Sequence, residues 1–317
     1  MVNNQQKSEM LKTIQTQCAE NDYKLLYAAI TGSHSYGMAT ENSDIDARFV
    51  FAAKDSFYLG FTGKDSFSIN GEDVSGYEFK KFIWLAYKNN PSVLEMLFIP
   101  DEFVLFTDDL FKIVLEQRDK FLSKLCYNTY LGYAQGQIEK AKTCTKPIIE
   151  ELENIEEGLR ENFIDPKMLS IKQAIRDVRV LPGRIYNHVP TITTIGELID
   201  YYKFFKQSKW PYNDLGNKRI GNVKKYGYDT KNISHAVRLI RTCHEIMTVG
   251  KLQVLRHDAD YLLRIKQGGY PLEILEEEVI MLEEMARKAK EMSKLPDIPD
   301  LSLIEHLTVN ILKQVIS

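Results

Sequence analysis

The sequence TGSHSYG at residues 31–37, followed by SDID at residues 43–46, decides how the first third of this chain folds. The preceding residues 27–30 are short and apolar enough to form a β-strand. Gly32 and Ser33 then allow backbone amides to approach an anion without a bulky side chain in the way. Residues 33–36 are predicted to begin a short helix that Gly37 ends in a left-handed conformation. Together these features predict a phosphate-binding turn.

The second stretch places two carboxylates close together. Asp44 and Asp46 lead into residues 48–51, which have high β-propensity, and residues two apart on a strand share a face. Neighbouring carboxylates repel each other and raise a pKa unless a cation lies between them. Oxygen ligands of this kind suit Mg²⁺, which completes its shell with substrate phosphates and water. The stretch therefore predicts a site for Mg²⁺, with Mn²⁺ as the alternative.

Taken alone, Gly-Ser is usually a loop and Asp-x-Asp a solvated turn, but their order and separation resemble the signature of the DNA polymerase beta nucleotidyltransferase superfamily. Residues 77–82 (YEFKKF), 89–91 (NNP) and 94–98 (LEMLF) more narrowly resemble a branch of predicted nucleotidyltransferases, some of which are associated with RNA repair. Looser similarity continues through residues 132–134 and 228–238. The resemblance implies metal-dependent transfer of NMP from an NTP, such as ATP, to an acceptor hydroxyl, with release of pyrophosphate.

The superfamily pattern also implies a third carboxylate on a neighbouring strand, and Asp73 and Glu78 are the candidates. Ser75 and Glu78 fit a capping box that closes the first turn of a helix, which gives Glu78 a structural role. Asp73 follows an Asn-Gly turn at residues 70–71 that suits a hairpin, so it can reach the sheet edge beside Asp44 and Asp46. We favour Asp73 as the third catalytic and metal-binding carboxylate, with Glu78 as the alternative.

The pattern along the chain changes near residue 100. Before it, helices predicted at residues 8–21 and 77–89 alternate with short strands that include a hairpin at 67–74. Beyond it, apolar residues recur with helical spacing. We therefore predict an α+β fold, in which a small mixed-sheet, polymerase-beta-like nucleotidyltransferase domain at residues 1–105 precedes a mainly helical domain at residues 106–317.

Composition agrees with an intracellular enzyme. The 317 residues are 44% hydrophobic and 27% charged, which suits a globular chain of about two domains. The net charge of -3 gives no general attraction to nucleic acid, so such binding needs a local patch. The four cysteines lie far apart and form no C-x-x-C pair, which argues against zinc or a disulfide framework. No stretch approaches the ~20 apolar residues of a membrane span, so we predict a cytoplasmic protein.

A basic segment at residues 218–241 is the candidate patch. Basic side chains outnumber acidic ones there, with two tyrosines between them; they are Lys218, Arg219, Lys224, Lys225, Lys231, Arg238 and Arg241, against Asp229 alone, with Tyr226 and Tyr228. Tyrosines can stack on bases while lysine and arginine contact phosphates, so the segment predicts contact with an RNA acceptor. Helical spacing could also bring Lys231, His235 and Arg238 to the triphosphate or base. The alternative is a solvated helix face balanced by acids elsewhere.

Other residues have weaker signals. His34 lies inside the turn and could contact a γ-phosphate, whereas any polar side chain could be tolerated there. Arg48 follows Asp46 by two positions and could neutralise a carboxylate or phosphate. Lys80 and Lys81 begin a predicted helix, where cations oppose the macrodipole, which indicates either a partner or simple exposure. Trp84 and Trp210 are more typical of a core or interface than of a base-reading cage.

Three functions fit these observations. The first is an enzyme that adds nucleotides to an RNA 3′ end, in tRNA or RNA repair, as the basic segment and the resemblance favour. The second transfers NMP to a protein or small-molecule hydroxyl and needs only a pocket. The third is a non-catalytic nucleotide- or RNA-binding scaffold, against which the intact carboxylates argue.

Overall fold

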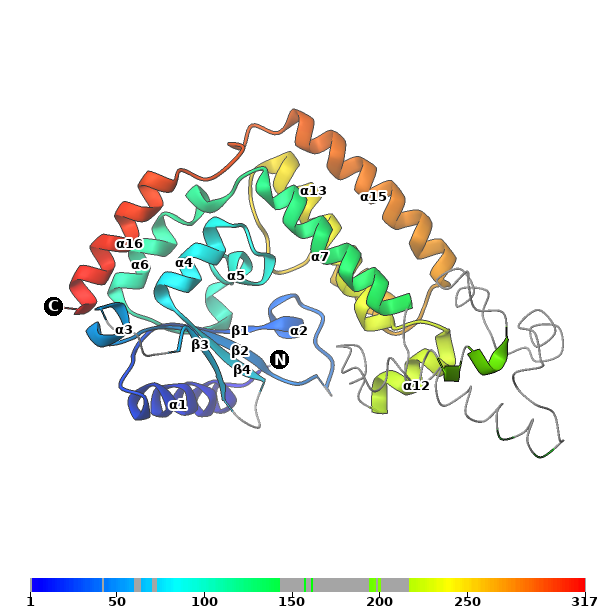
Figure 1. The fold of residues 1–317 in the computed structure, drawn as a ribbon, viewed down its shortest axis with the longest axis horizontal. Helices are drawn as coiled ribbons and strands as arrows, with labels where there is room; N and C mark the ends of the chain where they lie inside the picture. The colour runs from blue at the N-terminus through cyan, green and yellow to red at the C-terminus, as the bar shows by residue number, and fades with distance from the viewer. Residues whose placement is uncertain are drawn as a thin grey trace. The chain divides into compact units, whose positions relative to one another are not determined.

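The computed structural model describes residues 2–41, 43–59, 64–69, 73–142 and 217–316, together with 157, 161, 194–197 and 199–200. The first elements are α1 (Asn4–Glu20), β1 (Lys24–Thr31), α2 (Gly32–Ser35), β2 (Asp46–Ala52), α3 (Asp55–Leu59), β3 (Ser66–Ile69), β4 (Val74–Glu78), α4 (Phe79–Tyr87), α5 (Pro91–Met96), η1 (Asp101–Phe103) and β5 (Val104–Thr107). The later elements are α6 (Asp109–Glu116), η2 (Arg118–Phe121), α7 (Leu125–Lys142), α12 (Asn217–Tyr226), α13 (Thr230–Val249), α14 (Ala259–Lys266), α15 (Leu272–Met292) and α16 (Leu301–Ile316) (Figure 1). The predicted α+β class, a mixed sheet followed by helices, is confirmed.

The sheet has five strands in the order β3-β4-β2-β1-β5. β2 runs parallel to β4, and the other neighbouring pairs are antiparallel. The register aligns Thr31 with Asp46 and Ala47 with Val74. The end of β1 and the starts of β2 and β4 therefore meet at one edge of the sheet.

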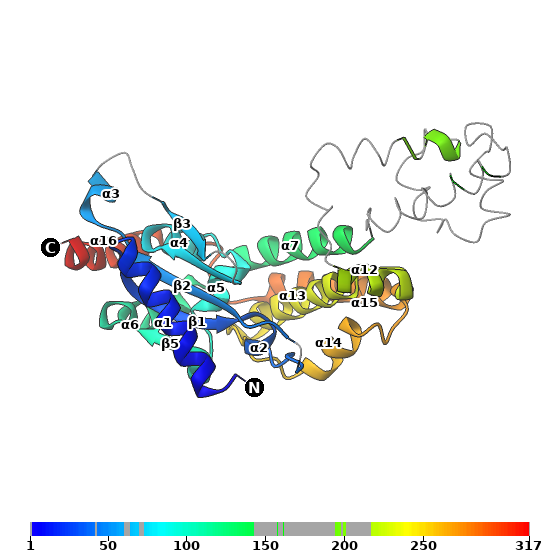
Figure 2. The ribbon, with the colours of Figure 1, turned by 90° about the horizontal axis from the view of Figure 1, so that it is seen from below.

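Helices cover the two faces of the sheet. Ala47, Phe49 and Phe51 of β2 pack in one core cluster with Ile14 and Cys18 of α1, and Figure 2 shows α1 lying across the strands. Alternate residues of a strand point to opposite faces, so the side chain of the first residue of β2 points away from α1. On that opposite face, α4 packs on β2 and β4.

The hairpin predicted at residues 67–74 is confirmed, because β3 pairs antiparallel with β4; its turn at residues 70–72 lies outside the described residues. The predicted capping box is wrong. Ser75 is part of β4, opposite Arg48, and the helix begins at Phe79. Its N-cap is Glu78, whose side chain accepts a hydrogen bond from the Lys81 backbone nitrogen at 3.0 Å. Strand pairing with β2 thus outweighs the local capping pattern.

A buried asparagine joins α4, α5 and α7. Asn89 has a φ of 53°, in the left-handed region, and its side chain is fully buried. Its Nδ2 donates to the Phe121 carbonyl at 2.7 Å, and its Oδ1 accepts from the Ser123 hydroxyl at 2.6 Å. Its own carbonyl accepts from the Thr129 hydroxyl at 2.7 Å. Asn89 therefore fixes the junction at which α4 ends and α5 begins.

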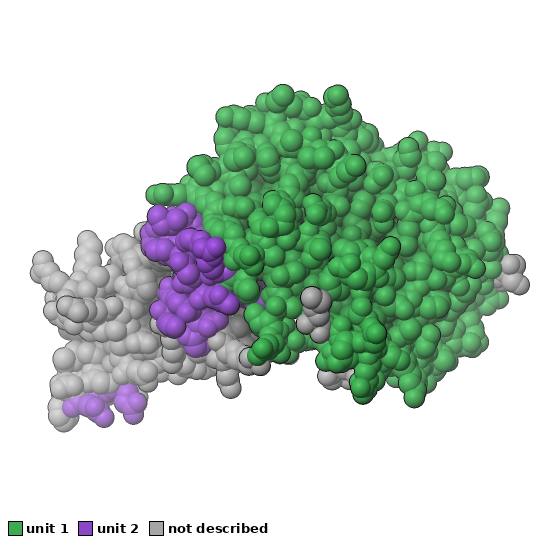
Figure 3. All heavy atoms as spheres, turned by 180° about the vertical axis from the view of Figure 1, so that it is seen from behind, with its two compact units in different colours: residues 1–134, 237–263, 277–317 green, residues 135–236, 264–276 purple. Residues whose placement is uncertain are grey.

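The chain divides into two compact units, coloured in Figure 3: unit 1 is residues 1–134, 237–263 and 277–317, and unit 2 is residues 135–236 and 264–276. This differs from the predicted boundary at residue 105, because the chain beyond it continues to cover the sheet. In α6, for example, Phe111 stacks on Tyr27 with a ring-centroid distance of 4.7 Å. In the part of the chain that the structure describes, no helix combines the length and apolarity that a bilayer crossing requires.

Candidate active site

The phosphate turn and the second aspartate meet at the sheet edge. Thr31 ends β1 opposite Asp46, and α2 begins at the next residue, Gly32, whose φ is 67°. A Cβ atom at Gly32 would lie 2.1 Å from the Asp46 Oδ2 atom. Only glycine therefore allows the carboxylate to lie directly against the backbone of the turn.

Asp73 lies at the same edge. It immediately precedes β4, and its carbonyl accepts a hydrogen bond from the Ala47 nitrogen at 3.1 Å, which places it beside Asp46. Asp44 lies two residues before β2, so the predicted strand position holds for Asp46 only. The side chains of Asp44 and Asp73 are exposed, and within the described residues neither has a hydrogen-bond or ion-pair partner. We call Asp44, Asp46 and Asp73 the carboxylate edge.

The carboxylate edge offers oxygen donors that fit Mg²⁺, which takes few protein carboxylates and completes its shell from phosphates and water. In the described ranges, no three Asp, Glu, His or Cys side chains come close enough to hold a metal ion by themselves.

Glu78, the alternative third carboxylate, lies at the opposite end of β4. It aligns with Phe51, near the end of β2, and its side chain is 1% exposed. Its Oε1 accepts from the Tyr58 hydroxyl at 2.5 Å, while its Oε2 caps α4. Glu78 is therefore a structural residue, and of the two candidates only Asp73 lies beside Asp46.

His34 and Arg48 flank this edge. His34 belongs to α2 and is 9% exposed, and its Nε2 atom finds no hydrogen-bond partner among the described residues. A buried polar atom without a partner is costly unless a ligand or water satisfies it. Arg48 is half-buried, and alternation along β2 places it on the face of Asp46. Their contact with phosphate stays a prediction.

The end of α2 is held through its C-cap residue, Tyr36, by two side chains from distant parts of unit 1. The Arg238 guanidinium stacks on the Tyr36 ring, 3.8 Å from its centroid, and donates to Glu95 Oε1 at 2.7 Å. The Tyr36 hydroxyl donates to the other oxygen, Oε2, at 2.8 Å. The side chains of Arg238 and Glu95 are each 4% exposed. We call Tyr36, Glu95 and Arg238 the buried clamp.

The charges of the buried clamp satisfy each other. Burial disfavours the charge of Arg238, but the Glu95 carboxylate outweighs burial and raises the pKa of the guanidinium. Burial also raises the pKa of the Tyr36 phenol, so it stays a hydrogen-bond donor. Arg238 therefore lies in an interior ion pair, and its contact with a triphosphate or base stays a prediction. Sequence reasoning missed Tyr36 and Glu95 as site residues.

A second segment of unit 1, residues 255–258, also contacts this turn. The Arg256 nitrogen donates to the Tyr36 carbonyl at 3.2 Å. Gly37 has a φ of 75°, and a Cβ atom there would lie 3.1 Å from Leu255 Cδ1. Gly37 therefore ends α2 in the predicted left-handed conformation and also admits Leu255.

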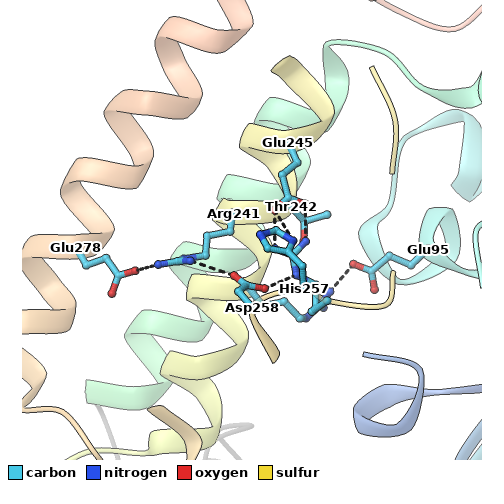
Figure 4. A network of polar contacts seen from close by, with 9 residues as sticks. Glu95, Arg241, Thr242, Glu245, His257, Asp258 and Glu278 are labelled. Carbon is cyan, nitrogen blue, oxygen red and sulfur yellow. Dashed lines mark hydrogen bonds and ion pairs between the residues drawn. The ribbon is translucent and has the colours of Figure 1, made fainter. Parts of the chain in front are cut away.

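Ion pairs hold this second segment (Figure 4). Arg256 contacts Glu245 at 2.5 Å and Asp258 at 2.9 Å. Arg241 bridges Asp258 at 3.1 Å and Glu278 at 2.6 Å. Arg241, like Arg238, is therefore paired with carboxylates, and the role of both arginines in the predicted basic segment stays a prediction.

The rest of the basic segment lies in unit 2. Tyr228 is 1% exposed and its hydroxyl donates to the Tyr270 carbonyl at 2.6 Å, so it does not offer a stacking surface. Lys225 and Lys231 are exposed. The side chains of Lys218, Arg219 and Lys224 lie outside the described residues. Because Lys231 and His235 belong to unit 2 and Arg238 to unit 1, the convergence of Lys231 and His235 on a triphosphate stays a prediction.

Comparison with known proteins supports the resemblance. Residues 4–152 match the model of the RNA repair pathway DNA polymerase beta family, which confirms the predicted recognition for this part of the chain. The match indicates a polymerase-beta-like nucleotidyltransferase connected with RNA repair.

Two curated relatives have no assigned activity. The chain is 26% identical over 292 residues to an uncharacterized 38.9 kDa protein in the nrdC-mobD intergenic region of Enterobacteria phage T4, covering 80% of this chain and 86% of the relative. It is 34% identical over 86 residues to the uncharacterized protein YcgL of Bacillus subtilis (strain 168), covering 23% of this chain and 30% of the relative. No solved structure matches significantly.

Proposed function

Starting from the match of residues 4–152 to the RNA repair pathway DNA polymerase beta family, we propose that this protein transfers NMP from an NTP to an RNA 3′ hydroxyl and releases pyrophosphate. The observation that supports this most is the contact of the Asp46 carboxylate with Gly32, at an edge that Asp73 shares. A phosphate turn and carboxylates side by side are the parts that this chemistry needs.

The chain's own groups would hold the triphosphate. The backbone amides of Gly32 and Ser33 would bind the β- and γ-phosphates, because Gly32 has no side chain of its own to cover them. The unpartnered Nε2 of His34 would complete a hydrogen bond to the same phosphates, and Arg48 would offset their charge. Lys231 and His235 are proposed to contact the triphosphate or base.

The carboxylate edge would hold the cations. Asp44 and Asp46 would bind Mg²⁺ or Mn²⁺ on the triphosphate side, and Asp73 would bind the ion on the acceptor side. When bound, such an ion neutralises phosphate charge and lowers the pKa of the acceptor hydroxyl.

In the reaction, the acceptor hydroxyl loses its proton to solvent, and its oxygen forms a bond to the α-phosphorus of the NTP. The bond between the α-phosphorus and the bridging oxygen breaks, and pyrophosphate leaves with the electron pair. The buried clamp would act as a positioning unit, because it fixes the end of the turn whose beginning binds phosphate. A cytoplasmic location remains a prediction.

The test is direct. Purified protein is incubated with each α-³²P-labelled NTP in turn, Mg²⁺ or Mn²⁺, and a single-stranded RNA oligonucleotide with a free 3′ hydroxyl. We expect labelled, extended RNA and an equivalent amount of pyrophosphate; an oligonucleotide with a blocked 3′ end should give neither.

The same assay with total protein or small-molecule hydroxyls separates the other acceptors. If label appears in protein or small molecules and none in RNA, the acceptor is a protein or small-molecule hydroxyl and not RNA. If no acceptor gives pyrophosphate, the proposed nucleotidyltransferase activity is wrong, and a non-catalytic nucleotide- or RNA-binding scaffold is favoured.

A further inference from the structure

Two aromatic side chains stand out on the surface of unit 1. Trp84 on α4 is 51% exposed and Tyr133 on α7 is 45% exposed, and they are the most exposed aromatic residues in the described ranges. Trp84 is therefore not a core residue. Exposing this much aromatic surface to water is unfavourable, and such residues are enriched where a partner binds.

Both aromatic residues are attached to one rigid junction. Trp84 stacks on Tyr87, with ring centroids 5.3 Å apart. The Tyr133 hydroxyl accepts a hydrogen bond from Asn90 Nδ2 at 2.7 Å. Asn89, the buried residue that fixes the end of α4, lies between Tyr87 and Asn90 in the sequence. The two rings are thus held in place before any partner arrives, which lowers the entropic cost of binding.

The two exposed charged side chains that flank Trp84 along α4 are both lysines. Lys80, Trp84 and Lys88 are exposed at i, i+4 and i+8, on one face of α4. The Lys88 ammonium lies 4.7 Å from the Trp84 ring centroid. Between residues 79 and 98 the single acidic residue is Glu95, which is buried with Arg238. This segment therefore presents no exposed carboxylate, in a chain whose net charge is -3.

A purely structural role explains only part of this arrangement. The cation–π contact of Lys88 with Trp84 stabilises the helix end, by about 0.5–1 kcal/mol at an exposed site. It does not account for Lys80, which points outward on the same face, or for the second exposed ring at Tyr133. Cations interleaved with exposed aromatic rings are the pattern of single-strand binding surfaces.

We propose that Lys80, Trp84, Lys88, Asn90 and Tyr133 form a stacking platform for single-stranded RNA. Bases stack on the two rings, the lysines contact backbone phosphates, and the Asn90 amide keeps Tyr133 in place. The platform rests on the proposed function, because it would hold the acceptor strand. α4 covers the face of the sheet toward which Asp46 points. An RNA strand bound on α4 would therefore lie on the same side of the sheet as the carboxylate edge.

The platform is tested by binding alone, with EDTA and without NTP, so that catalysis plays no part. The probe is a fluorescein-labelled 12-nucleotide single-stranded RNA, followed by anisotropy over a series of salt concentrations. We expect the combined variant Trp84→Ala and Tyr133→Ala to bind at least about tenfold more weakly, since each stacked base contributes about 1–3 kcal/mol. Trp84→Phe should retain most of the affinity. Lys88→Ala should reduce the dependence of affinity on salt.

A matched control is Ile280→Ala, which removes an apolar side chain that is 68% exposed on α15 and should leave binding unchanged. RNA should also quench tryptophan emission in the parent protein and not in Trp84→Phe. Melting temperatures of all variants verify that the fold persists.

Unchanged affinity in the double alanine variant, or equal competition by heparin and RNA, would overturn the platform. Extension of RNA in the transferase assay, with affinity unchanged by these substitutions, would leave the proposed function intact and reject the platform alone. Binding that fails while pyrophosphate is still released to another acceptor would reject both the platform and the RNA acceptor.

Discussion

The charged side chains at the two ends of the short helix α2 differ in exposure and pairing. At its beginning, Gly32 touches Asp46, and the side chains of Asp44 and Asp73 are exposed without partners in the described part of the chain. At its end, Tyr36 joins an arginine and a glutamate that are almost completely buried and satisfy each other. Residues of one short stretch thus divide into exposed groups that are available to a ligand and buried groups that hold the backbone in place.

The sharpest test of the comparison is Asp46→Asn. If the carboxylate edge is needed for catalysis and not for folding, transfer activity should fall by about 10³-fold. Removing one group that stabilises charge in the transition state typically has an effect of this size. The melting temperature should stay within a few degrees, because the change relieves repulsion between carboxylates. Initial rates of pyrophosphate release and calorimetry measure the two effects. Normal turnover with normal metal dependence would count against the assignment.

Arg238→Met should show the opposite pattern. Removing the cation leaves Glu95 buried without its partner, which should lower the free energy of unfolding by about 3–5 kcal/mol. Urea denaturation measures the loss. The double variant with Glu95→Leu should recover part of it, because it removes the uncompensated charge.

The exposed control is Arg287→Met, whose guanidinium pairs with Glu284 and Glu291 on the surface of α15; it should lose less than about 1 kcal/mol. Equal losses at positions 238 and 287 would contradict the interior role of the buried clamp.

Gly32→Ala tests whether the two ends cooperate through the backbone. The new Cβ would collide with Asp46 Oδ2, at 2.1 Å, in a backbone with φ of 67°. The carboxylate must move, so activity should fall roughly tenfold, as expected for a small misplacement of a reacting group. The control is Gly136→Ala, where an added Cβ meets nothing within 4 Å and where activity should not change. Full activity of Gly32→Ala would show that activity does not depend on the contact between Asp46 and the turn.

The smallest effect concerns pH. Burial raises the pKa of the Cys126 thiol from 9.0 to about 12, and Tyr130, close to this cysteine and to the buried clamp, also has a raised pKa because of burial. Since the folded protein holds the proton of Cys126 more tightly than the unfolded chain does, its stabilisation is complete below pH 9 and is lost as the pH rises toward 12.

At pH 10, Cys126 alone should lower the free energy of unfolding by about 1.4 kcal/mol relative to neutral pH. Urea titrations at several pH values measure this, with Cys126→Ala as the comparison that should flatten the dependence. If the free energy of unfolding of Cys126→Ala depends on pH as in the parent protein, another group causes the loss of stability at alkaline pH.

The sequence predicts the local part of the site well. Gly32 and Asp46 are close in the chain, and pairing of β1 with β2 leaves few ways to place them apart. The buried clamp could not be predicted in this way, because its hydrogen bonds span 59 and 143 residues. One signal was present: Glu95 is a lone acid in an apolar segment, and a buried acid needs a partner. The pattern does not say which arginine supplies it, and the basic segment at residues 218–241 predicts a phosphate contact for Arg238. Ser75 shows the converse, since a good local capping pattern yields to strand pairing.

The dependence of Tyr36 on Arg238 and Arg256 has a consequence for protein engineering. Residues 4–152, the span that matches the family, would not make an autonomous catalytic fragment. A protein truncated there would bury Glu95 with no counter-ion and leave the Tyr36 carbonyl without its donor, so the turn at residues 32–37 depends on contacts from residues about two hundred positions later in the chain.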